Sequence, residues 1–196
     1  YTLYIVGLNM ILKMFTEDAV TVLGIYYKIQ SFFFIPLLGF QQVLLPLFSY
    51  HYGAGDYRRN NEILKWSVMF SVGIMAVATG IFFMAPEKLI QIFSTGSAIV
   101  AIGKYAFPVI SISFIFAGLT IVITSYLQGI AHIKASLFII VLRQIFLLVP
   151  LAWLFHFMGL NAVWWTFPVT EIIASMTGVL TVLIFKHRVK RKSLLL

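Results

Sequence analysis

The chain has 196 residues, a formal net charge of +8, a hydrophobic content of 61% and a mean hydropathy of +1.00. It contains no cysteine, which excludes disulfides, thiol nucleophiles and thiolate metal clusters. The Lys and Arg residues gather beside long apolar runs, so we expect them to be juxtamembrane anchors facing a lipid bilayer, with no nucleic-acid partner.

Apolar runs long enough to cross a bilayer follow one another along the chain. A transmembrane helix needs about 20 predominantly apolar residues to cross ~30 Å of hydrocarbon. Since the first run is short and the chain begins with Tyr1, we expect a fragment that starts inside a helix. The expected spans are 1–15 (partial), 19–48, 63–85, 100–128, 135–157 and 162–185, followed by a basic cytoplasmic tail at 186–196.

This pattern predicts an all-α polytopic membrane protein, because backbone groups in lipid must be hydrogen-bonded within each segment and no strand alternation is visible. The six helices, the first of them partial, form one bundle, and residues 1–196 form a single transmembrane lobe. No soluble domain or internal repeat interrupts it.

Charge asymmetry between the connections predicts the orientation. Residues 50–61, residues 129–134 and the C-terminal tail are rich in Lys, Arg and His, whereas the alternate connections carry few positive charges. The positive-inside rule places the first set, including the C-terminus, in the cytoplasm. On the outer side, the mixed stretch between Pro86 and Lys104 predicts a short interfacial helix. Trp153, Trp164 and Trp165 are expected to form an aromatic belt there.

Three ionisable side chains fall within the predicted spans at similar depth: Lys28, Arg143 and Glu171. Charges inside a membrane are costly, so each is a functional hypothesis. We expect all three to meet near the midplane in a network whose only anion is Glu171. Two interpretations stay open. The network is either a structural ion pair that fixes helix packing, or a site where Glu171 takes up a proton or meets a cationic solute.

Uncharged polar residues extend this candidate pathway. Gln30 and Gln42 lie on the longest span, and Thr120 and Thr124 belong to a mild polar stripe on the span at 100–128. The stripe fits a cavity lining, but Thr hydroxyls also satisfy their own helix backbone, so both interpretations remain. The sequence has no zinc-protease motif, no serine-hydrolase motif and no P-loop, so we expect neither an enzyme nor a cofactor.

Two stretches resemble the multidrug and toxic compound extrusion (MATE) family. IPLLGFQQVLLPLFSYHYGAGDYRRNNEILKWS resembles a hallmark segment of a lobe, and YLQGIAHIKASLFIIVLRQIFLLVPLAWLF with GLNAVWWTFPVTEIIAS resembles the last two helices of the C-terminal lobe in bacterial members. The resemblance covers the whole chain but only half of a member, which has twelve helices in two lobes. It therefore implies a C-terminal lobe whose partner, the N-terminal lobe of the same polypeptide, is missing.

The resemblance implies a secondary active antiporter of the bacterial inner membrane. Such a protein exports small amphipathic or cationic compounds by alternating access, coupled to H+ or Na+. The blocks around Lys28, Arg143 and Glu171 match the family pattern. Some members carry an Asp in the helix that corresponds to 100–128, and this chain has no carboxylate there, so the resemblance leaves the coupling ion open. Two alternatives remain: a lipid-linked saccharide flippase of the same superfamily, and a six-helix substrate-capture subunit of an ATP-driven vitamin importer.

Overall fold

The computed structural model describes residues 2–193, and the side chains of residues 4–187. Throughout these residues the regular structure is helical and no strand is present, which confirms the predicted all-α class. In chain order the helices are α1 (Thr2–Lys13), α2 (Glu17–Gly53), α3 (Tyr57–Met84), α4 (Pro86–Gln91), α5 (Ser97–Gly129), α6 (Ile133–Val141), the π-helix η1 (Leu142–Leu147), α7 (Leu148–His156), α8 (Leu160–Trp164) and α9 (Thr166–Ser193).

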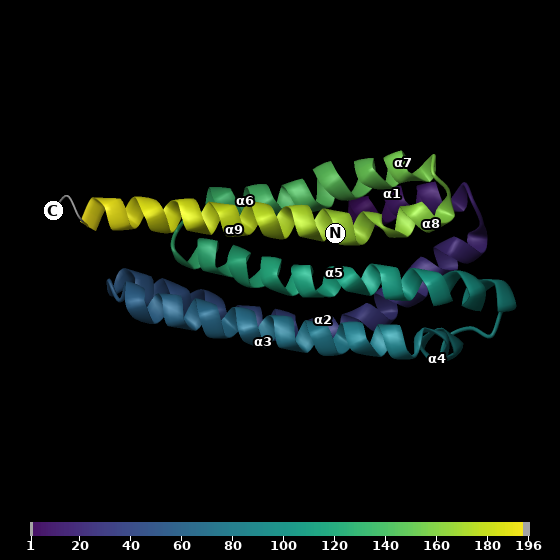
Figure 1. Ribbon diagram of the computed structural model, residues 1–196, viewed down its shortest axis with the longest axis horizontal. Coiled ribbons are helices and arrows are strands. Elements are labelled where there is room, and N and C mark those ends of the chain that lie inside the picture. The colour runs from purple at the N-terminus through teal and green to yellow at the C-terminus, as the bar shows by residue number, and fades with distance from the viewer. Residues whose placement is uncertain (1, 194–196) are drawn as a thin grey trace.

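The long helices run side by side along one axis, with α5 at the centre (Figure 1). On one side α5 packs against α2 and α3, and on the other against α6 and α9. Its sequence explains this position. It is apolar or small all round, and a helix without a polar face is stable only where neighbours cover it. Buried positions accordingly occur on every side of α5.

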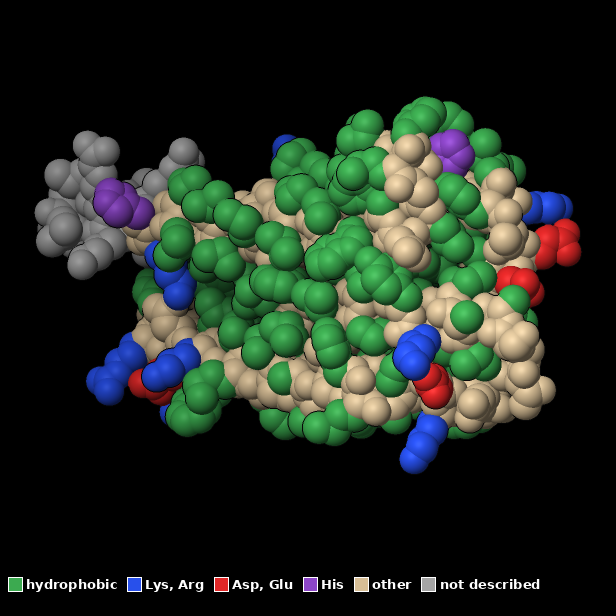
Figure 2. Space-filling view, turned by 45° about the vertical axis from the view of Figure 1, so that its right-hand side comes forward, with side chains coloured by type: hydrophobic (Ala, Val, Ile, Leu, Met, Phe, Trp, Pro, Cys, Tyr) green, Lys and Arg blue, Asp and Glu red, His purple; other side chains and the backbone are tan. Residues whose placement is uncertain are grey.

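Five helical segments are long and apolar enough to cross a membrane. They are Glu17–Gly53, Tyr57–Met84, Ser97–Gly129, Ile133–His156 and Leu160–His187, and a shorter apolar helix covers Tyr4–Lys13. Figure 2 shows hydrophobic side chains over the middle of the visible face, whereas most of the charged side chains lie toward its ends. This distribution is the one that a hydrocarbon layer with polar interfaces requires.

The connections lie at the two ends of the bundle as the charge pattern predicts. The α2–α3 turn, the α5–α6 turn and the end of α9 lie together, and the α1–α2 turn, α4 and α8 lie at the opposite end (Figure 1). Side chains cap the starts of α2 and α3. The Thr16 hydroxyl accepts a hydrogen bond from the Ala19 amide (3.1 Å), and the Asp56 carboxylate accepts one from the Arg59 amide (2.9 Å). Gly55 has a φ of +73°, which a glycine adopts without strain.

Two expected spans differ in detail from the structure. The span at 135–157 consists of α6 and α7 joined by η1, and the last span is interrupted at Trp165. The short helix expected after Pro86 is confirmed as α4. Residues 186–193, expected as a tail, continue α9. Most of the expected basic tail lies outside the residues whose side chains are described: Arg188, Lys190, Arg191 and Lys192.

An aromatic cluster holds α2, α3, α5 and α9 together. The Tyr26 ring lies 5.6 Å from that of Phe167 and 6.2 Å from that of Phe114, and the Phe82 ring lies 5.0 Å from that of Phe114. Buried aromatic pairs in edge or offset geometry stabilise a fold beyond their buried area, by about 0.5–1.5 kcal/mol each. The cluster therefore fixes α2 and α9 around α5 beside the cavity described next.

Candidate functional site

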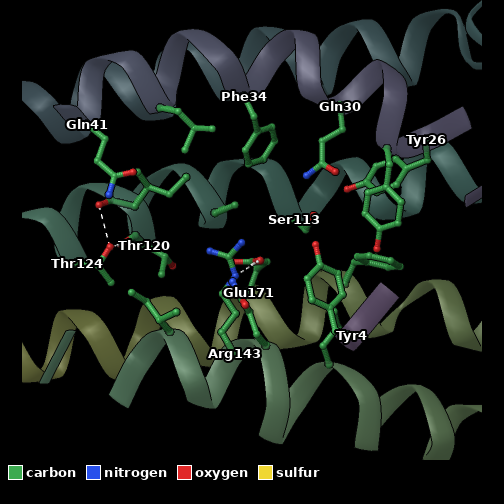
Figure 3. Close-up of a pocket in the computed structure, with 18 residues that line it drawn as sticks. Tyr4, Tyr26, Gln30, Phe34, Gln41, Ser113, Thr120, Thr124, Arg143 and Glu171 are labelled. Atoms are coloured by element: carbon green, nitrogen blue, oxygen red, sulfur yellow. Dashed lines mark hydrogen bonds and ion pairs between the residues drawn. The ribbon is translucent and has the colours of Figure 1, made fainter. Parts of the chain in front are cut away.

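A cavity of about 280 Å³ lies inside the bundle, between α2 and α5 on one side and α6, η1, α7 and α9 on the other (Figure 3). Most of its wall is aromatic or aliphatic. The polar part of its lining comes from four elements and consists of Gln30 and Gln41 on α2, Ser113, Thr120 and Thr124 on α5, Arg143 and Gln144 on η1, and Glu171 on α9.

An ion pair between Arg143 and Glu171 lies in the middle of this wall (Figure 3). The Arg143 Nε lies 2.7 Å from the Glu171 Oε1. The Glu171 residue is 8% exposed, and its other carboxylate oxygen, Oε2, is buried without a hydrogen-bond partner among the described residues. The described part of the protein therefore leaves this buried oxygen of the Glu171 carboxylate without a hydrogen bond.

The local structure explains how Arg143 reaches the pair. It is the second residue of η1, and the Leu148 amide that follows this segment donates to the Arg143 carbonyl, five residues back. Such π segments widen a helix locally and occur often at functional sites. Pro150 lies three residues after η1, and its ring clashes with the carbonyl four residues before it, which disturbs the regular ladder there.

Burying the Arg143–Glu171 pair has a high desolvation free energy, and the two charges attract each other strongly. Removing two charges from water costs several kcal/mol per ion, and their mutual attraction offsets this cost only with good geometry and satisfied neighbours. The unpartnered Oε2 means that the Glu171 carboxylate is incompletely satisfied by the protein itself. A buried pair of this kind is therefore weak evidence for a purely stabilising role.

The hydroxyls of α5 bond to their own helix. The Thr120 Oγ1 donates to the Phe116 carbonyl (2.9 Å), and the Thr124 Oγ1 lies 2.9 Å and 3.0 Å from the carbonyls of Thr120 and Ile121. Both threonines nevertheless line the cavity. The two interpretations of this stripe are therefore compatible, since the donated hydrogen satisfies the backbone while the oxygen lone pairs remain for a ligand.

The prediction that Lys28 joins the ion pair is wrong. Lys28 is exposed, and its Nζ lies 5.8 Å from the centre of the Phe93 ring. The reason is its helix face: Lys28 and Gln30 are two residues apart, which turns them about 200° from one another on an α-helix. Gln30 lines the cavity, so Lys28 points away from it.

Of the other expected site residues, Gln30, Thr120, Thr124, Arg143 and Glu171 line the cavity, and Gln42 does not. Gln42 is exposed, because it lies one residue, or about 100°, beyond Gln41 on α2.

Several cavity residues were missed, and for one of them the sequence carried a usable signal. Gln41 follows Gln30 by eleven residues, which is about three turns, so both lie on one face of α2. Tyr4, Tyr26, Tyr27 and Gln144 also line the cavity. Aromatic residues are common in an apolar bundle, so nothing in the sequence separated these tyrosines from the core. Within the described part of the chain, no three His, Asp or Glu side chains lie together as metal ligands.

Breaking the pair from the arginine side gives a stability test. Arg143→Gln leaves the buried Glu171 carboxylate without its cation, and we expect it to lower the free energy of unfolding by about 3–5 kcal/mol. The double variant Arg143→Gln/Glu171→Gln should recover most of that loss, because no buried charge remains. Thermal unfolding of both variants in the same detergent measures the difference. A double variant less stable than the single would contradict the ion pair.

Comparisons with known proteins agree with this architecture. The MatE family pattern matches residues 1–154. The chain is 25% identical over 181 residues to a multidrug export protein MepA of Staphylococcus saprophyticus, covering 92% of this chain and 40% of that protein. The chain therefore spans about 40% of the length of the curated relatives it matches.

Solved structures with the same fold include two conformations of a multidrug resistance MATE family transporter of the MOP superfamily. The outward-facing one gives a TM-score of 0.85 at 18% identity, over 91% of this chain and 41% of that one. The inward-facing one gives 0.87 at 17% identity, over 95% of this chain and 44% of that one. The family match extends over most of the residues that build the bundle and the cavity, including Arg143. The chain is therefore a multi-pass membrane protein that belongs to the MATE family.

Proposed function

We propose that this chain is the C-terminal lobe of a secondary active exporter of amphipathic or cationic compounds. The observation that carries the proposal is the Arg143–Glu171 pair on the wall of an internal cavity, with one carboxylate oxygen of Glu171 unpartnered. The export activity named for the MepA relative supports the same assignment.

The cavity suits such solutes chemically. Its aromatic lining, which includes Tyr26, Phe34 and Phe167, offers apolar area and ring faces that attract organic cations. Glu171 supplies the negative charge. A flippase of phosphate-bearing lipids has less support, because Arg143 is the only Lys or Arg in the described cavity lining.

The mechanism we propose is competition for Glu171 between a coupling ion, H+ or Na+, and the solute. A ligand shifts a conformational equilibrium only by its differential affinity for the two states. Uptake of the coupling ion would favour one orientation of this lobe against the N-terminal lobe, and uptake of the solute would favour the other. The similarity of this bundle to both outward-facing and inward-facing structures supports a lobe that moves as one body.

The orientation we propose follows from the charges. The first turn of α3 carries Arg58 and Arg59, and the last part of α9 carries Lys186. The positive-inside rule puts this end of the bundle, and the C-terminus with it, in the cytoplasm of a bacterial cell with the protein in the inner membrane.

The test is export itself. The protein, expressed at its natural length in bacteria whose own efflux pumps are deleted, should lower the accumulation of a cationic dye such as ethidium. In inside-out membrane vesicles, either an imposed H+ gradient or an imposed Na+ gradient should drive dye uptake. The gradient that drives uptake identifies the coupling ion. Unchanged dye accumulation at normal membrane expression, with no response to either gradient, would contradict the proposal.

A further inference from the structure

A second hollow lies on the outer surface of the bundle, between α2 and α3. This α2–α3 groove has a volume of about 590 Å³. It is lined by Phe40, Val43, Leu44 and Leu47 on α2 and by Arg59, Glu62, Ile63, Trp66, Ser67 and Phe70 on α3.

The groove is separate from the central cavity. The two share no lining residue. On α2, Val43 follows Gln41 by two residues, which turns it about 200° away at 3.6 residues per turn. The groove therefore faces the surroundings of the bundle rather than the Arg143–Glu171 pair, and the proposed transport mechanism makes no use of it.

The groove has one charged end and one apolar end. Toward the α2–α3 turn, Arg58 and Arg59 each lie 3.4 Å from a carboxylate oxygen of Glu62, and Lys65 places its Nζ 6.0 Å from the centre of the Trp66 ring. Asp56, whose carboxylate accepts a hydrogen bond from the Arg59 amide, lies at the same end, so three cations and two anions leave it with a net charge of +1 (3 − 2).

Beyond the charged end the lining is almost wholly apolar. Val43 is 62% exposed and Phe70 is 53% exposed. From Phe40 to Leu47 the groove follows α2 for about 10 Å at 1.5 Å per residue. Both helices that form the groove are long and apolar enough to span a membrane.

We infer that the α2–α3 groove binds an anionic phospholipid. Its acyl chain lies along Phe40, Val43, Leu47 and Phe70, and its phosphate lies at Arg59. A lipid is the occupant whose polarity changes along its length as the groove does: an apolar chain followed by a negative headgroup at the membrane surface. Trp66, 64% exposed, stands at the boundary, where indole rings prefer to lie. Juxtamembrane cations attract anionic lipids by about fivefold in affinity each.

Native mass spectrometry tests this inference directly. The protein, purified at its natural length in a non-ionic detergent, is titrated with phosphatidylglycerol and with phosphatidylcholine carrying identical acyl chains. We expect phosphatidylglycerol to bind about fivefold more tightly, from the one uncompensated positive charge. Equal dissociation constants for the two lipids would overturn the inference.

Arg58 and Arg59 provide a matched pair of variants. Both are exposed and both pair with Glu62 at 3.4 Å, but only Arg59 lines the groove. Arg59→Gln should weaken phosphatidylglycerol binding about fivefold and Arg58→Gln less than about twofold. Equal losses in the two variants would mean diffuse attraction without a built site, which also overturns the inference.

The apolar half of the groove is tested by Leu47→Trp, which fills it from an exposed position of α2. The variant should lose phosphatidylglycerol binding and keep the unfolding temperature of the unmodified protein. Retained binding would overturn the inference. A dimer that forms without bound lipid and is lost in Leu47→Trp would also overturn the inference. The groove would then be occupied by a second copy of the chain.

Discussion

Glu171→Gln is expected to reduce export of a cationic dye more than about tenfold, a loss of ~1.4 kcal/mol or more of differential binding, while the protein still inserts in the membrane. Glutamine has the shape of glutamate and its amide oxygen still accepts a hydrogen bond from Arg143. It carries no charge and takes up no proton or cation. The variant therefore keeps the packing of α9 and removes the property that the proposed mechanism needs.

The experiment is an efflux assay in pump-deficient bacteria at matched membrane expression. Glu62→Gln is the control, since it also removes a carboxylate but lies on α3 outside the cavity. It should export as the unmodified protein does. Normal export by Glu171→Gln would remove Glu171 from the mechanism and leave the ion pair as a structural contact.

The fold was predictable because a bilayer imposes a length and a polarity on each span. The apolar runs predicted the short first helix and five helices long and apolar enough to span a membrane, with ends within six residues of those observed, and the charges predicted how the connections alternate between the two ends. Neither inference needs knowledge of which helices touch.

The sequence predicted how deep in the membrane each charged site residue lies, but not toward which neighbouring helix its side chain points. Arg143 and Glu171 were expected to meet because both are charged residues far from the ends of their spans, and they do meet. Lys28 lies at a similar depth, but on the face of α2 that points away from the cavity. Residue counting from a span boundary fixes depth at 1.5 Å per residue, whereas the face also depends on how each helix is rotated against its neighbours.

The π-helix at Leu142–Leu147 could not be predicted. Its residues include neither Gly nor Pro, and the sequence LRQIFL is compatible with an α-helix. Pro150 indicates a disturbance nearby, but whether a helix responds by kinking, by opening or by widening depends on its neighbours. The π-helix is important for the proposed function, because η1 is the element that carries Arg143 into the cavity.

Gly129→Ala is expected to destabilise the bundle strongly, although it adds a single methyl group. A Cβ atom at Gly129 would lie 2.5 Å from the Phe48 Cβ and 3.3 Å from both the Leu45 carbonyl oxygen and the Ser49 nitrogen. Backbone and Cβ atoms cannot rotate away, so α2 and α5 must move apart around Gly129. Overpacking of this kind costs about 1–3 kcal/mol, and more where neither partner yields.

At the upper end of that range the unfolding temperature should fall by about 6–12 °C for a chain of this size. Gly80→Ala on α3 is the matched control, since a Cβ there meets no atom within 4 Å and the unfolding temperature should stay almost unchanged. Thermal unfolding of both variants in one detergent provides the comparison. Because α2 carries Gln30 and Gln41 while α5 carries Thr120 and Thr124, separation of these helices also opens the cavity wall. Export should therefore fall together with stability in Gly129→Ala, and equal unfolding temperatures for the two variants would contradict the close approach of α2 and α5 at Gly129.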